Sequence, residues 1–243
     1  MEYAIKILIL ALAYFIGSIP FGALIVKIST GKDIRRIESG RTGGTNAMRA
    51  AGPWAGALTG LCDLLKGTVA VLISRYMFPD AYWLHVFAGL AAVLGHNYSV
   101  FLMERRENGR IRLHGGAGGA PTSGGAIGLW PPIMLVIAPL GILIWYFIGY
   151  ASITTLSFGV IITLVFIYRA ANGASPWEYV AYGVIAEGIL VLALRPNIRR
   201  LMRGEERLVG FRARRRRKKA AAANDARLTA SSSPHIPNKP TKN

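Results

Sequence analysis

Apolar residues in this chain come in long blocks that are separated by short polar stretches. Four clear blocks cover residues 5–27, 54–74, 82–103 and 177–194. A helix needs about 20 apolar residues to cross the hydrocarbon core of a bilayer, so each block predicts a membrane-spanning helix. No small-residue cleavage motif in a polar setting follows the first block, which we therefore interpret as a retained helix and not as a signal peptide.

A longer apolar region covers residues 118–168 and is interrupted twice. Pro131-Pro132 forms the first interruption, and the polar run 150–155 forms the second. A double proline cannot continue a helix, because each ring removes a donor and crowds the preceding turn. We therefore expect three further spans near 118–130, 133–149 and 152–168. The predicted fold is an all-α integral membrane protein with seven transmembrane helices.

The basic residues predict the orientation of these helices. They gather in the segments 27–53 and 104–114 and in the tail from Arg195 to Lys219, whereas the opposite connections hold only Arg75 and Arg169. The positive-inside rule places the basic segments in the cytoplasm. Segments and tail share one side only if the number of spans is odd, which favours seven. The N-terminus is then outside and the C-terminus cytoplasmic.

Composition changes this picture little, except at the C-terminal end. The chain is 52% hydrophobic and 17% charged, with a net charge of +17, and its single cysteine, Cys62, excludes a disulfide framework. We expect one membrane domain over 1–206 and a basic, disordered cytoplasmic tail over 207–243, because the tail has too little apolar content to fold alone. Attraction to anionic membrane lipid is the favoured interpretation of the tail. Contact with partner proteins is an alternative, and nucleic acid is disfavoured because no aromatic residues are interleaved with the charges.

The segment 38–49 is the first candidate for chemistry. It combines hydroxyls, an amide, three glycines and two arginines. Glycines let backbone N–H groups approach an anion, and arginine supplies a planar charged fork, so the segment predicts a phosphate nest. A plain interhelical turn is the alternative.

Other polar residues lie within or just after the predicted spans. Asp63 and Lys66 share one helix face and predict either a structural ion pair or a functional pair. His96 is a candidate proton carrier or phosphate ligand, or a structural residue. The glycine-rich segment 113–125 leads into a helix, whose amides would favour an anion, although it could equally be a linker. Spacing alone supports no metal cluster, paired-carboxylate site or catalytic triad.

Taken in order, these segments resemble one known family. The segments are Gly17-Ser-Ile-Pro-Phe-Gly22, Ser39-Gly-Arg-Thr-Gly-Gly-Thr-Asn46 with Arg49, Asp63-Leu-Leu-Lys-Gly67, Gly95-His96 with Val100-Phe101, Tyr150-Ala-Ser152, and Asn197-Ile-Arg-Arg200 with Gly204 and Glu206. Over about residues 7–206 they resemble the acyl-phosphate-dependent glycerol-3-phosphate acyltransferases, the PlsY family of bacterial inner-membrane enzymes.

The resemblance implies a seven-span fold with its motifs on the cytoplasmic face of the inner membrane. It implies transfer of a fatty acyl group from acyl phosphate to the 1-hydroxyl of glycerol 3-phosphate, which gives lysophosphatidic acid and phosphate in phospholipid synthesis. No metal or cofactor is expected, and the enzyme that makes acyl phosphate is an expected partner. By the same resemblance the catalytic residues are Ser39, Asn46, His96, Asn197 and Glu206. The residues expected to bind substrate phosphate are Gly40, Thr45, Arg49, Lys66, Gly115, Gly116, Gly118, Thr122, Ser152 and Arg200.

The chain departs from the family pattern around its second motif. Ser99 stands in place of a proline, an inserted charged stretch covers 104–114, and both motif lysines are missing, with Ala117 at the position of the second. In the first motif Arg41 replaces the usual asparagine. Either Arg41, or Arg110 and Arg112 of the insertion, restores the lost charge, or the chain is an inactive or substrate-shifted relative that binds phosphorylated lipid intermediates. A small-solute transporter is a weaker alternative, because the sequence has no internal repeat.

Overall fold

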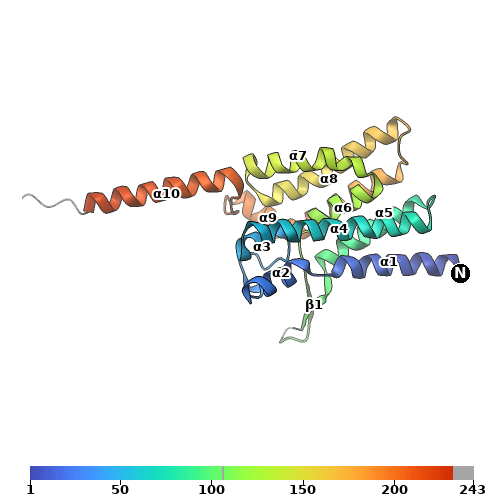
Figure 1. Ribbon diagram of the computed structural model, residues 1–243, viewed down its shortest axis with the longest axis horizontal. Coiled ribbons are helices and arrows are strands. Elements are labelled where there is room, and N and C mark those ends of the chain that lie inside the picture. Colours follow the sequence, from blue (N-terminus) through green and yellow to red (C-terminus); the bar gives the residue numbers. More distant parts are fainter. Residues whose placement is uncertain (106, 232–243) are drawn as a thin grey trace, which may run out of the picture.

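The computed structural model describes residues 1–105 and 107–231, and it is mostly helical (Figure 1). The helices and strands are α1 (Glu2–Ser18), α2 (Phe21–Thr30), η1 (Ile34–Arg36), α3 (Gly44–Ala51), α4 (Pro53–Met77), α5 (Tyr82–Asn97), β1 (Ser99–Arg105), β2 (Ile111–His114), α6 (Gly119–Leu129), η2 (Pro131–Ile133), α7 (Met134–Leu143), η3 (Ile144–Ile148), α8 (Ala151–Ala171), α9 (Glu178–Met202) and α10 (Gly210–Ser231).

Five segments of the described chain are long and apolar enough to cross a membrane. They are Glu2–Thr30, Pro53–Met77, Pro131–Ile148, Ala151–Ala171 and Glu178–Met202. Helices α5 and α6 occupy the other two predicted positions but have only 16 and 11 residues, fewer than the roughly 20 that a full crossing takes. The chain is therefore a membrane protein with several apolar helices, whereas the count of seven and the orientation stay predictions.

The first predicted span is two helices and not one. Helix α1 ends at Ser18 and α2 begins at Phe21. Pro20 lies between them, and a proline within a helix removes a backbone donor and clashes with the preceding turn. The break turns α2 away from the line of α1, close to α3 (Figure 1).

A β-hairpin corrects the all-α prediction. Helix α5 ends at Asn97, so the predicted span 82–103 is wrong beyond that residue, and β1 follows and pairs antiparallel with β2. The reason is local: valine, phenylalanine and isoleucine favour strands, and Asn108-Gly109, with Gly109 at a φ of +76°, is a strong hairpin-turn sequence.

The tail contains a further helix. Residues 210–231 form helix α10, because alanine, arginine and lysine have high helix propensities even without a core to pack against. The disorder expected from the composition stays a prediction, and residues 232–243 lie outside the described residues. Figure 1 shows α10 leaving the bundle at the end opposite the N-terminus.

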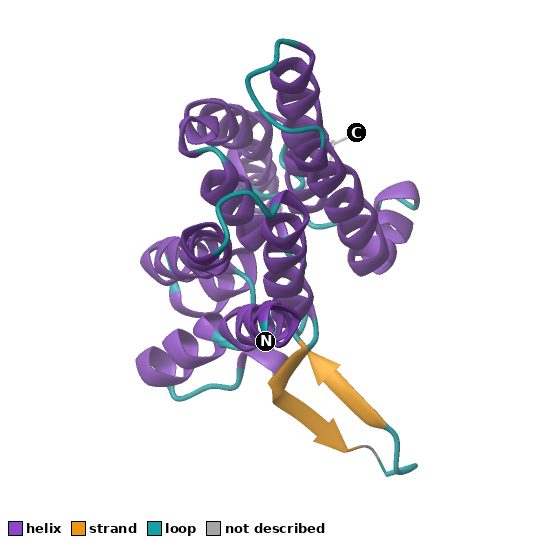
Figure 2. Cartoon of the chain, turned by 90° about the vertical axis from the view of Figure 1, so that its right-hand side faces the viewer, coloured by secondary structure: helices purple, strands orange, loops and turns teal. Residues whose placement is uncertain are grey.

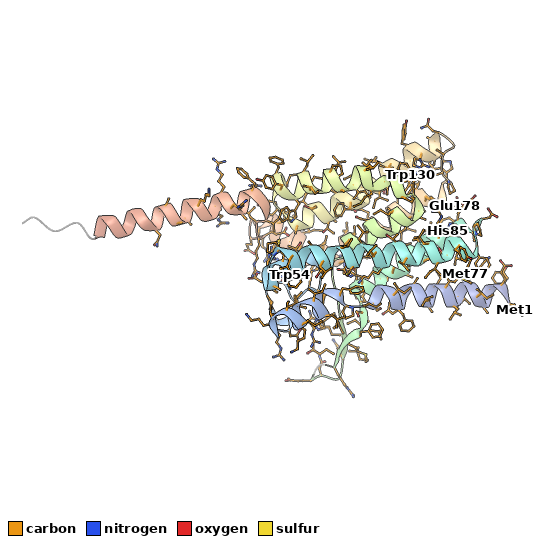
Figure 3. The ribbon with its side chains drawn as sticks, viewed as in Figure 1. Met1, Trp54, Met77, His85, Trp130 and Glu178 are labelled. Carbon is orange, nitrogen blue, oxygen red and sulfur yellow. The ribbon has the colours of Figure 1, made fainter. Side chains whose placement is uncertain are left out.

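Glycines at helix crossings let the bundle pack closely. A Cβ on Gly17 of α1 would lie 2.2 Å from the carbonyl oxygen of Ala92 in α5, and a Cβ on Gly67 of α4 would lie 2.2 Å from that of Pro121 in α6. Small residues at such crossings let helix backbones approach each other within a membrane. In Figure 3, Trp54 lies at one end of the bundle and Met77 near the other, so α4 runs along its whole length.

Candidate active site

The loop before α3 is held in place by one buried amide. The Nδ2 group of Asn46 lies within hydrogen-bond distance of three carbonyl oxygens, those of Arg41 at 2.8 Å, Ile37 at 3.0 Å and Ile34 at 3.3 Å. Two N–H groups cannot satisfy all three fully, so Asn46 is shared among them. Its Oδ1 is buried and has no hydrogen-bond partner within the described part of the chain.

Glu206 joins two helices at the same end of the bundle. Its Oε2 accepts a hydrogen bond of 2.6 Å from the Ser152 hydroxyl at the start of α8, and its Oε1 accepts one of 3.2 Å from Asn197 Nδ2 in α9. The carboxylate is only 8% exposed. Glu206 therefore fixes the positions of two polar side chains that precede it by 54 and 9 residues.

A second polar cluster is built around Asp63. The carboxylate lies 2.9 Å from Lys66 Nζ and 3.4 Å from His96 Nδ1, and all three side chains are buried. Lys66 also donates to the carbonyl of Ile19 in the break between α1 and α2. Charges so far from water persist because they are paired, so the predicted i, i+3 ion pair is confirmed.

Arg41 connects the first polar loop to the glycine-rich loop. Its Nη1 donates to the Gly116 carbonyl at 3.3 Å, and its Nη2 donates to the carbonyl of Ala193 in α9. The next residue, Thr42, donates its backbone N–H to the Gly115 carbonyl at 3.2 Å. Two loops that lie far apart in the sequence are therefore fastened side by side.

A cavity of about 600 Å³ lies between these groups, within the roughly 300–1,000 Å³ typical of small-molecule sites. Its polar end is lined by loop residues, by the ends of α3, α5, α6, α8 and α9, and by residues of α4. The polar and charged lining side chains there are Glu38, Ser39, Arg41, Thr45, Asn46, Arg49, Asp63, His96, Ser152, Asn197, Arg200, Glu206 and Arg207.

The other wall of the cavity is apolar. It comes mainly from α7, η3 and α8, and its members are Met134, Ile137, Ala138, Gly141, Ile142, Trp145 and Phe158. One cavity thus offers a charged end to a polar group and an apolar wall to a hydrocarbon chain.

The N-terminal ends of α3 and α6 bring glycines to the polar end of the cavity. Gly43, Gly44 and Thr45 at the start of α3, and Gly118 and Gly119 at the start of α6, all line the cavity. Gly118 has a φ of +95°, a conformation that favours glycine. Backbone N–H groups at helix starts attract anions.

Positive charge exceeds negative charge at this end. Glu38 pairs with Arg207 and Asp63 with Lys66, which leaves Glu206 as the lining carboxylate nearest to Arg41, Arg49 and Arg200. Burial lowers the pKa of Arg41, and the neighbouring Arg200 lowers it further. Burial likewise lowers the pKa of Arg49. Three arginines and only one neighbouring carboxylate leave an excess of positive charge, which a bound anion would stabilise.

Comparison with known proteins agrees with this geometry. A family model described as glycerol-3-phosphate acyltransferase matches residues 7–204. The chain belongs to this family. It is similar to the glycerol-3-phosphate acyltransferase of Rubrobacter xylanophilus, with 36% identity over 86% of this chain and 98% of that protein. A glycerol-3-phosphate acyltransferase of Thermus thermophilus is 38% identical over 84% of this chain and 95% of its own length.

Solved structures of the family have the same fold. The crystal structure of PlsY, an integral membrane glycerol 3-phosphate acyltransferase, in its glycerol 3-phosphate form superposes with a TM-score of 0.71 at 32% identity and covers 84% of this chain and 96% of that chain. Its lysophosphatidic acid form gives a TM-score of 0.70 at 29% identity. The resemblance inferred from the sequence motifs is therefore confirmed, and with it the membership of a family of membrane acyltransferases in phospholipid synthesis.

Most of the site residues predicted from the family motifs line the cavity. The structure brings together Ser39, Thr45, Asn46, Arg49, His96, Gly118, Ser152, Asn197, Arg200 and Glu206. The remaining predicted residues, Gly40, Lys66, Gly115, Gly116 and Thr122, are not part of its lining.

Specific contacts account for the residues that lie elsewhere. Lys66 is occupied by Asp63 and Ile19 and is 4% exposed. Gly116 packs against His96, since a Cβ there would lie 1.9 Å from the imidazole Nε2. The direct phosphate contact predicted for Lys66 does not fit this placement. Gly40 has a φ of +67°, and the Thr122 carbonyl accepts a hydrogen bond of 2.7 Å from the Tyr182 hydroxyl.

The site contains groups that no motif pointed to. The apolar wall of α7 and α8 is one, because an apolar helix facing lipid and one facing a cavity have the same composition. The ion pair between Glu38 and Arg207 at the mouth is another. Glu38 has a φ of +52°, a backbone conformation that sequence composition does not predict for glutamate.

Proposed function

We propose that this chain transfers a fatty acyl group from acyl phosphate to the 1-hydroxyl of glycerol 3-phosphate, and that it releases lysophosphatidic acid and inorganic phosphate. The observation that carries the proposal is that one cavity has both an arginine-rich end and an apolar wall. Both substrates carry a phosphate and one carries a long hydrocarbon chain, so both halves of the cavity would be used. The glycerol 3-phosphate and lysophosphatidic acid forms of the related PlsY structure support the same acceptor and product here.

The proposed reaction needs no covalent intermediate with the protein. The 1-hydroxyl oxygen of glycerol 3-phosphate attacks the carbonyl carbon of acyl phosphate, a new ester C–O bond forms, and the bond to the phosphate oxygen breaks. The departing phosphate takes the hydroxyl proton. Since acyl phosphate is already an activated mixed anhydride, the protein has mainly to align the two substrates and stabilise the developing negative charge.

The polar lining suits those two tasks. We assign the binding of substrate phosphate to Ser39, Thr45, Arg49, Arg200 and the N–H groups at Gly118. Asn46 offers its unpartnered Oδ1 to a substrate hydroxyl. Asn197 is held by Glu206, and Glu206 also holds Ser152, so we assign a positioning role to this carboxylate. His96 is orientated by Asp63.

Arg41 is our candidate for the charge that is absent at Ala117. Its guanidinium bonds to the carbonyl of Gly116, next to Ala117, and both Arg41 and Ala117 line the cavity. Arg110 and Arg112 of the inserted stretch are exposed and do not line it. An active enzyme is therefore favoured over an inactive or substrate-shifted relative.

We further propose that α5 and α6 cross the membrane with the five longer segments, that the N-terminus is outside, and that the cavity opens to the cytoplasm of a bacterial cell at its inner membrane. The asymmetry of basic residues supports this orientation. Short crossing helices are tolerated where other helices surround them, and much of α5 and α6 is buried. The enzyme that produces acyl phosphate remains an expected partner.

A competition between acyl donors tests the proposal. The purified protein in lipid vesicles is given glycerol 3-phosphate with palmitoyl phosphate and palmitoyl-CoA, each donor labelled with a different carbon isotope. We expect lysophosphatidic acid to carry the label of palmitoyl phosphate. Product labelled from palmitoyl-CoA would contradict the donor assignment. If glycerol 3-phosphate is bound but no product forms, the inactive relative is the better description.

A further inference from the structure

The β1–β2 hairpin has one polar face and one apolar face. Glu104 pairs with Arg112 across the two strands, and Glu104 Oε2 lies 2.8 Å from His114 Nε2, so these three residues share the polar face. Met103 pairs with Leu113 on the opposite face, because side chains alternate along a strand.

The apolar face has little protein against it. Arg105 pairs with Ile111 on this face, and the side chains are largely exposed: Met103 by 56% and Ile111 by 65%. Phe101, which precedes Met103 in the part of β1 where the register with β2 is irregular, is 58% exposed. Figure 2 shows the two strands extending away from the helices. An isolated two-stranded hairpin is at best marginally stable in water, so something other than water is expected to cover this face.

The root of the hairpin is continuous with the membrane-facing surface of α1. The ring centroids of Phe101 and Phe15 lie 6.4 Å apart, and Phe15 is 50% exposed on a helix that belongs to a candidate span. In Figure 1 the hairpin leaves the bundle sideways, near the break between α1 and α2 and across the direction of the helices. It therefore extends along the plane of the bilayer and not away from it.

Unpaired backbone groups of the hairpin limit how deeply it can enter the bilayer. A two-stranded sheet has unpaired N–H and C=O groups along both edges, which the hydrocarbon core cannot satisfy. The headgroup region can satisfy them with water and lipid oxygens, and it also accepts an apolar face. Arg105 and Arg110 are exposed on the hairpin, and their long stems let the guanidinium groups reach the lipid phosphates.

We propose that the β1–β2 hairpin lies in the headgroup region of the bilayer, with Phe101, Met103 and Ile111 against the acyl chains and with Arg105 and Arg110 on anionic lipid headgroups. The hairpin leads directly into the glycine-rich loop, where Thr42 bonds to Gly115 and Gly116 bonds to His96. Contact with the membrane thus anchors one border of the cavity at the lipid surface.

Neighbouring positions on opposite faces provide a matched test. In a Cys62→Ser background, Ile111→Cys and Arg112→Cys each carry a nitroxide label in the full chain, reconstituted in vesicles of phosphatidylcholine with phosphatidylglycerol. Molecular oxygen concentrates in the lipid, whereas a neutral nickel chelate concentrates in the water. Each reagent shortens the electron spin relaxation time of the nitroxide labels that it can reach. We expect oxygen to shorten the relaxation time more than nickel does for the label at position 111, and nickel to shorten it more than oxygen does for the label at position 112. Met103→Cys gives a second label on the apolar face in case Ile111→Cys does not fold.

Two results would overturn the proposal. Strong relaxation by nickel at both positions would place the hairpin in water, and protection of the Ile111 label from both reagents would mean that protein covers the face. The role of anionic lipid is tested with the same Ile111 label in vesicles of different composition. We expect the ratio of oxygen to nickel effects at Ile111 to fall in pure phosphatidylcholine, and to depend less on phosphatidylglycerol once Arg105→Gln is added. A ratio that does not respond to lipid charge would contradict the headgroup contact.

Discussion

Replacing Arg41 by asparagine removes one of the three arginines that share Glu206 at the polar end of the cavity. A hydrogen bond to a charged group contributes about 1.5–3 kcal/mol, and about 1.4 kcal/mol corresponds to a tenfold change in rate. If Arg41 binds a substrate phosphate, Arg41→Asn should lower kcat/KM for acyl phosphate by about 10- to 150-fold. The measurement is the initial rate of lysophosphatidic acid formation over a range of palmitoyl phosphate concentrations.

A second substitution separates charge from anchoring. Arg41 also bonds the carbonyls of Gly116 and Ala193, so its loss could act by loosening the glycine-rich loop. Ala117→Lys places a cation in the same cavity without restoring those bonds. We expect Arg41→Asn with Ala117→Lys to recover most of the lost activity, and Arg112→Asn, outside the cavity, to behave as wild type.

The double variant decides between these explanations. If it is as impaired as Arg41→Asn while both remain folded, the charge argument for Arg41 is refuted and anchoring of the loop is its function. If Arg112→Asn is the variant that loses activity, the inserted stretch supplies the cation instead.

Three further predictions concern stability and chain length. Lys66→Met removes the ammonium group from the 2%-exposed carboxylate of Asp63 and leaves only His96 beside it, so we expect about 3–5 kcal/mol of destabilisation; an unchanged melting temperature in detergent would contradict this. Gly67→Ala should separate α4 from α6, because the new Cβ would meet the α6 backbone at 2.2 Å, whereas Gly188→Ala on α9 meets nothing within 4 Å. Size-exclusion chromatography after mild heating should show aggregation of the first variant alone. Ala138→Phe adds a large side chain to the apolar wall and so narrows the cavity. Activity with palmitoyl phosphate should therefore fall about tenfold relative to activity with the shorter decanoyl phosphate. An equal loss of activity with both donors would argue against this wall as the acyl site.

The sequence predicts the helices well where apolar length decides the structure. The positions of α4, α7, α8 and α9 follow from apolar blocks and from the double proline at 131–132. The hairpin escapes prediction because Val100 to Met103 continue the apolar block of α5, although Asn108-Gly109 is a turn sequence that points to it. The helix over Gly210–Ser231 escapes prediction because low apolar content argues for disorder, whereas helix propensity decides the structure there.

Site residues can be predicted from the sequence where a motif contains them, but their contacts cannot be predicted where these form between distant segments. Asn46, Asn197 and Glu206 are identified from their motifs, but nothing local reveals that Glu206 bonds both Ser152 and Asn197. The position of Lys66 depends on the break at Ile19-Pro20, which brings a carbonyl to its ammonium group. Such contacts between distant segments form only in the folded bundle.

The most direct test of the account is the stoichiometry of products from the purified protein in lipid. Palmitoyl phosphate and labelled glycerol 3-phosphate are supplied, and lysophosphatidic acid and inorganic phosphate are measured together, beside an Asn46→Ala control. The account predicts equal amounts of the two products, and the loss of both in the control. Phosphate release without lysophosphatidic acid, or no product from a folded protein that Ala117→Lys also fails to activate, would contradict acyl transfer by this cavity.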